Sequence, residues 1–190
     1  KALRKKELKR YFSSAIYVFN TIFGVVIIFI AAVSSFFYSF DKISNLMEIE
    51  GQATNSFTMI LYLLLFVIAF TDITASSISI ERENFWIMKM IPVNPKEIFS
   101  AKKYVNIIIL IPVVLISLVL FTLSGYITLS EMLLLMLLTI VYTYFVANFG
   151  LIVNLMYPKL DAINDTIIVK QSMATFIGVI GGMLFVVLII

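Results

Sequence analysis

Five long runs without a charged residue constrain this chain more than any other feature of its sequence. Each run has 20 to 30 residues and contains no Asp, Glu, Lys or Arg. The runs are 11–40, 51–71, 104–130, 132–158 and 171–190. About 20 apolar residues in a helix cross the hydrocarbon core of a membrane, so each run is long enough to span it.

The composition agrees with this interpretation. The 190 residues are 62% apolar and 13% charged, and their mean hydropathy is +1.07. Such a chain has too few polar residues to cover the surface of a soluble protein with buried helices. We therefore predict an all-α fold, a polytopic transmembrane helical bundle. Its predicted spans are 16–40, 57–75, 104–124, 131–156 and 171–190.

The chain begins within a basic segment and ends within an apolar run, and a complete membrane protein would continue beyond both. The sequence begins KALRKKELKR without a methionine and stops inside the apolar run GGMLFVVLII. We expect a single transmembrane domain fragment, 1–190, from a longer protein.

The basic residues predict the topology. If the chain crosses five times, thirteen of its 14 Lys and Arg residues fall on the side of the N-terminus, and only Lys42 falls on the other. Basic loops favour the cytoplasmic side of a membrane. We therefore expect a multi-pass protein of the cell membrane, with the N-terminus and the 72–103 loop in the cytoplasm.

The N-terminal segment predicts an interfacial helix over 1–14. Leu8, Tyr11 and Phe12 share one helical face among six basic residues, a pattern typical of helices that bind anionic lipid surfaces. A plain basic flank of the first span is the alternative. The nearby span argues against nucleic acid as a partner.

Several residues within the spans have structural interpretations. Ala174, Gly178 and Gly182 recur every four residues, a spacing that favours close helix packing. Asparagines within or near the spans either bond across helices or line a polar cavity; they are Asn20, Asn106, Asn148 and Asn154. Asp72 is expected at the inner end of the second span, where water or Arg82 and Lys89 keep it charged, too shallow for a proton relay.

Missing residue types exclude several kinds of chemistry. The chain has no His and no Cys, so imidazole or thiolate catalysis, zinc sites built on these residues and disulfides are absent. It also lacks the GxxxxGK[ST] loop that binds nucleotide phosphates. We expect no enzyme activity in this chain and no cofactor.

One polar stretch, 77–103, interrupts the apolar sequence and contains eight of the 25 charges and the only Trp. The part from Thr74 to Met90 has no Gly or Pro and can form a helix. Asn94 then has the character of an N-cap, with Pro95 at the first helical position. The stretch predicts a helix, a break and a second helix that runs into the third span. It is either a solvated connector or a docking element for a cytosolic partner.

Three stretches resemble the ABC-2-type permeases of ABC transporters, especially the large bacterial exporters of that group. SSISIERENFWIMKMIPVNPKEIFSAK, 76–102, resembles their loop between the second and third helices of a half. ELKRYFSSAIYVFNTIFG, 7–24, resembles the connecting helix and first span of the second half, and NLMYPKLDAINDTIIVKQS, 154–172, resembles the inner loop before the fifth helix. Arg82 is a departure, because family members often have Gly after the Glu.

The resemblance implies a permease whose full half has six spans, an exporter driven by a separate ABC ATP-binding subunit. The stretch 77–92 would be the coupling helix within a coupling region of 76–103. The implied docking residues are Glu81, Arg82, Glu83, Asn84, Trp86 and Lys89, and the implied coupling turn contains Pro92, Asn94 and Pro95. The other expected partners are membrane lipids and either the missing parts of the chain or a second permease half.

Two other functions are consistent with the same residues. An ATP-independent transporter or channel would need charged or paired polar residues in mid-bilayer, and the predicted span interiors have no charged residues. A membrane scaffold protein would also use a cytosolic docking loop, and the sequence leaves this alternative open.

Overall fold

The computed structural model describes residues 2–38, 55–90 and 92–189, and every element in that part of the chain is a helix. Five segments there are long and apolar enough to cross a membrane: Ala15–Ser34, Ser56–Ile87, Pro95–Leu123, Leu129–Met156 and Asp165–Val187. The predicted all-α bundle is confirmed, and the chain is a multi-pass membrane protein. The end of the predicted first span and the loop with Lys42 lie outside the described residues.

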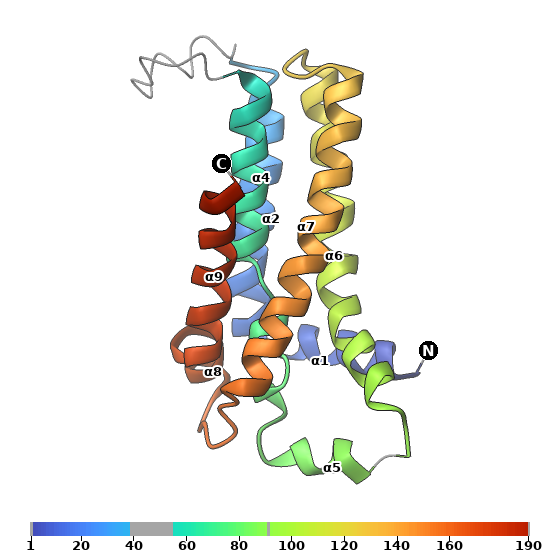
Figure 1. The fold of residues 1–190 in the computed structure, drawn as a ribbon, viewed down its shortest axis with the longest axis vertical. Helices are drawn as coiled ribbons and strands as arrows, with labels where there is room; N and C mark the ends of the chain where they lie inside the picture. The colour runs from blue at the N-terminus through green and yellow to red at the C-terminus, as the bar shows by residue number, and fades with distance from the viewer. Residues whose placement is uncertain (1, 39–54, 91, 190) are drawn as a thin grey trace.

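The long helices run side by side along the long axis of the molecule (Figure 1). They are α2 (Ala15–Ser34), α4 (Ser56–Phe70), α6 (Pro95–Leu123), α7 (Leu129–Met156) and α9 (Met173–Ile189). Helix α1 (Ala2–Ser13) lies across one end of this bundle, and α8 (Asp165–Gln171) precedes α9 at the same end (Figure 1). We call this the α1 end.

The connection between α4 and α6 differs from the single helix expected over 77–92. It consists of two 3-10 helices, η1 (Thr74–Ser76) and η2 (Ser79–Asn84), followed by the short helix α5 (Phe85–Met90). The break falls at Arg82, whose φ of 49° and ψ of −134° are not helical. In Figure 1, α5 lies beyond the α1 end of the bundle.

Local capping residues explain where the helices begin and end. Asn94 caps α6 by accepting a hydrogen bond of 3.0 Å from the Lys96 backbone, and Pro95 occupies the first turn. Thr128 and Glu131 form a capping box at the start of α7. Gly125 adopts a φ of 80° in the turn between these helices, where glycine carries no steric penalty.

Apolar side chains divide between the interior of the bundle and its outer surface. Ile28, Leu64 and Leu135 are fully buried in one cluster shared by α2, α4 and α7. Phe19 and Val141, on α2 and α7, are exposed. An exposed apolar surface of this kind faces lipid in a membrane protein, so the interior contacts are left to van der Waals packing and polar bonds.

Candidate functional site

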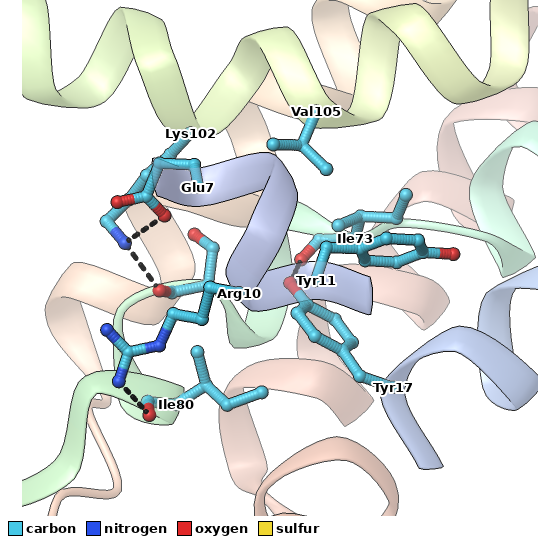
Figure 2. A pocket seen from close by; sticks show the side chains of 9 residues that line it. Glu7, Arg10, Tyr11, Tyr17, Ile73, Ile80, Lys102 and Val105 are labelled. Carbon is cyan, nitrogen blue, oxygen red and sulfur yellow. Dashed lines mark hydrogen bonds and ion pairs between the residues drawn. The ribbon is translucent and has the colours of Figure 1, made fainter. Parts of the chain in front are cut away.

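Charged side chains from three elements meet at the α1 end of the bundle. Glu7 and Arg10 come from α1, Glu81 comes from η2, and Lys102 comes from the early turns of α6. Figure 2 shows Glu7 and Lys102 pointing toward each other, with Arg10 beside them extended toward Ile80. We call these four residues the ion-pair cluster.

Lys102 is the centre of the cluster and is only 1% exposed. Its Nζ donates hydrogen bonds to Glu7 Oε2 at 3.1 Å, to Glu81 Oε1 at 2.9 Å and to the Ser77 carbonyl at 2.7 Å. These three bonds use all three protons of the ammonium group. Arg10 pairs with the other oxygen of Glu81 and donates a bond of 3.0 Å to the Ile80 carbonyl.

The burial of the cluster determines what it does. Glu7, Glu81 and Lys102 are buried, whereas Arg10 is 25% exposed. Removing one partner of a buried ion pair is strongly destabilising, because the other charge is then left buried without compensation. Because its partners come from α1, η2 and α6, the cluster holds these elements in one arrangement. Glu81 is thus an internal ion-pair residue, which corrects its expected place on a docking surface.

Two tyrosines border the apolar side of the cluster (Figure 2). The Tyr11 and Tyr17 rings meet edge to face with centroids 5.2 Å apart, and the Tyr11 hydroxyl bonds to that of Thr21. Burial raises the pKa of Tyr11, so this hydroxyl stays neutral. The space left between these residues and the cluster is about 10 Å³, room for one water at most, so no substrate binds there.

Asn154 on α7 binds the backbone of the connection. Its Oδ1 accepts hydrogen bonds from Ile78 N at 2.7 Å and Ser79 N at 3.1 Å, and its Nδ2 donates to Ser79 Oγ at 2.7 Å. The same Ser79 oxygen accepts a bond of 2.9 Å from Lys159 N. Of the two roles left open for Asn154, the structure therefore shows bonding between elements.

Arg82 links η2 to α8. Its guanidinium pairs with Asp165 and donates a longer bond of 3.4 Å to the Ile163 carbonyl. Asp165 also accepts a bond of 2.5 Å from Ser14 Oγ. Arg82 is therefore engaged within the chain rather than free for a partner.

The remaining predicted docking residues lie at the exposed part of the connection. Glu83 and Asn84 are exposed at the end of η2, and Trp86 and Met90 on α5 are 59% and 73% exposed. The side chain of Lys89 lies outside the described ones. With Ile87, three exposed large apolar side chains lie on this one short helix and make a surface that water solvates poorly.

The predicted coupling turn joins this surface to the third span. Pro92, Asn94 and Pro95 are all exposed, and α6 begins at Pro95, where the sequence predicts a new helix. Lys102 lies two turns into the same helix. The turn and the ion-pair cluster thus connect to one continuous span.

Asp72 follows α4 directly, at the end of the second span as predicted, but its surroundings differ from those expected. The residue is 5% exposed, and Arg82, its expected neighbour, pairs with Asp165 instead. The expectation that water or Arg82 keeps Asp72 charged is wrong, because η1 turns the chain back into the bundle after α4.

The small residues of α9 pack against this turn and against α4. Ala174 is fully buried. A Cβ atom at position 178 would lie 2.7 Å from the Ala75 side chain, and one at 182 would lie 3.0 Å from that of Ala69.

Sequence reasoning missed Glu7, Arg10 and Lys102 as functional residues. Glu7 is the one acid in a strongly basic N-terminal segment, and this isolation was an available signal. Its partner Lys102 is 95 residues away, a separation at which no local pattern identifies a contact.

Comparisons with protein-family models, curated proteins and solved structures find no match to this chain. The function is therefore argued from the residues and their geometry.

Proposed function

We propose that this chain is part of the membrane-spanning permease of an ABC transporter, an exporter driven by a separate ATP-binding subunit. The observation that carries the proposal is the exposed surface of η2 and α5, formed by Glu83, Asn84, Trp86 and Met90, beyond the α1 end of the bundle. A partly apolar helix with a Trp and a polar border has the composition of a protein interface. We call it the docking surface.

The connections behind the docking surface support a coupling role. Glu81 is bonded to Lys102 on α6, Arg82 to Asp165 on α8, and the η2 backbone to Asn154 on α7. A displacement of η2 by a bound ATPase would therefore act on several membrane-spanning elements at once, as a rigid-body switch. ATP hydrolysis itself would take place in the partner.

The basic residues support a cytoplasmic position for this surface. The α1 end carries Arg4, Lys96 and Lys159 together with most other Lys and Arg residues of the described chain, and such loops favour the cytoplasm. An ATP-binding subunit would meet the permease on that side of the cell membrane.

Photo-crosslinking from position 86 tests the proposal. A photoreactive amino acid replaces Trp86 in the native membrane, and the captured protein is identified by mass spectrometry. We expect a protein that contains the GxxxxGK[ST] loop and hydrolyses ATP. A partner without this loop would support the scaffold alternative and overturn the proposal.

Binding measurements then locate the contact. Trp86→Ala should weaken the complex at least about tenfold, as buried interface tryptophans do, and reduce ATP-driven export in vesicles to a similar degree. Phe12→Ala is the matched control, since Phe12 is 62% exposed on α1 and lies outside the docking surface. Equal losses in both variants would contradict the proposed contact.

A further inference from the structure

One buried acid has no role in the coupling path described above. Asp72 follows α4, and its Oδ2 has no hydrogen-bond partner in the described part of the chain. No described cation pairs with it: on α6, Lys102 is bound in the ion-pair cluster and Lys103 donates to Asn148. An ionised carboxylate in such a place is costly unless something compensates its charge.

The other elements packed around Asp72 contribute no positive charge. The titratable groups that face it are the Tyr17 hydroxyl on α2 and the Tyr142 hydroxyl on α7. Tyr17 donates its proton to the Ile73 carbonyl, and Tyr142 donates to the Gly182 carbonyl at 2.8 Å. Helix α9 has no titratable residue. Neither hydroxyl proton is left for Asp72.

The hydrogen-bond geometry identifies where a proton is missing. The Thr74 Oγ1 atom lies 2.6 Å from Asp72 Oδ1 and 2.9 Å from the Ala147 carbonyl oxygen. Both neighbours are acceptors when Asp72 is ionised, and a hydroxyl has one proton to donate. Asp72 Oδ1 also accepts a hydrogen bond of 2.9 Å from the Thr74 backbone N–H. A proton on Asp72 completes the hydroxyl chain, because the acid then donates to Thr74 Oγ1 and Thr74 Oγ1 donates to the Ala147 carbonyl.

The backbones of α7 and α9 close over the carboxyl group. A Cβ atom at position 150 would lie 1.8 Å from Asp72 Oδ2, and one at 178 would lie 3.4 Å from it. Only a residue without a side chain allows α7 to approach this closely, and the described residues include no group of three acidic side chains that could hold a metal ion. The occupant that fits is a proton.

We propose that Asp72 is a proton-binding site at the junction of η1, α7 and α9. The proton comes from water and binds to a carboxyl oxygen of Asp72. The resulting O–H group donates a hydrogen bond to Thr74 Oγ1. Its release returns it to water and leaves an unpaired negative charge against the backbones at Gly150 and Gly178, so release requires the junction to open. The proposal is independent of whether an ATPase binds at the docking surface.

Infrared spectroscopy of the purified chain in lipid tests this directly. At mildly acidic pH, the wild-type protein should show the carbonyl-stretching band of a protonated carboxylic acid, shifted in D₂O, and the band should be missing from Asp72→Asn. Asp161→Asn is the control, because Asp161 is exposed to water, and it should keep the band. Thr74→Val should retain the acid but shift its band, since the hydrogen-bond acceptor is lost.

The pH dependence of stability gives a second readout. The folded junction binds a proton that the unfolded chain releases, so this contribution to the wild-type melting temperature should fall as pH rises through the mildly acidic range toward neutral. Asp72→Asn, which has no titratable group at this position, should lack this component. A wild-type spectrum without the acid band, or a band that persists in Asp72→Asn, would overturn the proposal.

Discussion

Arg82 combines an unfavourable backbone conformation with a favourable side-chain contact. Its positive φ belongs to a region where a Cβ atom is strained and glycine is not. The side chain offsets this strain by pairing with Asp165.

Two substitutions at Arg82 separate these effects. Both Arg82→Gly and Arg82→Ala lose the ion pair, but only glycine relieves the backbone. We expect the glycine variant to be more stable than the alanine variant by about 1–3 kcal/mol in free energy of unfolding. Fluorescence of Trp86, the only tryptophan, follows unfolding in detergent. Glu83→Gly and Glu83→Ala are the control, and here the alanine variant should be the more stable one. If the glycine and alanine variants at position 82 have equal free energies of unfolding, the backbone at Arg82 is not strained.

At the scale of elements, α1 belongs to the bundle through buried charge rather than through apolar contacts alone. Glu7 and Glu81 are 6% and 2% exposed, and both bind the ammonium group of Lys102. If that ammonium is removed, two carboxylates remain buried near each other with only Arg10 and the half-exposed Lys6 to compensate them. The attachment of α1 therefore depends on one lysine.

Lys102→Met should destabilise the protein by about 3–5 kcal/mol and detach α1, as measured by the free energy of unfolding and by proteolysis of the N-terminal segment. Adding Glu81→Gln should restore part of the loss, because one uncompensated charge is removed. Lys103→Met is the matched control, since Lys103 is partly buried and contacts Asn148 and the Tyr144 ring rather than a carboxylate in the described part of the chain. A loss at position 102 no larger than at 103 would contradict the role of the cluster.

The sequence predicts the elements better than it predicts the contacts between them. Long uncharged runs identify the spans because lipid imposes the same requirement on each helix, and Asn94–Pro95 marks the start of α6 because capping is local. The burial of Glu81 depends on partners from α1 and α6, so its neighbours in sequence wrongly indicated a polar surface. The burial of Asp72 escaped prediction for a similar reason, since it depends on the packing of α7 and α9 against the turn after α4.

At the scale of the whole molecule, the charges are distributed unevenly between the two ends of the bundle. The α1 end has the ion-pair cluster, the docking surface and nearly all described basic residues, whereas the connection between α6 and α7 at the other end has Glu131 as its nearest charge. An asymmetry of this kind orients a membrane protein with its basic end in the cytoplasm. In the first proposal the ATPase binds at this basic end. In the second, the proton site lies within the bundle.

Thiol labelling tests this orientation, because the chain has no cysteine of its own. Ser130→Cys introduces an exposed thiol at the α6–α7 end, and Ile163→Cys introduces one at the α1 end, where Ile163 is 87% exposed. In intact cells an impermeant reagent should label position 130 and leave position 163 unreacted. After permeabilisation both should react, which controls for accessibility. Labelling of 163 alone in intact cells would reverse the topology, and an ATP-binding subunit in the cytoplasm would then be unable to reach α5.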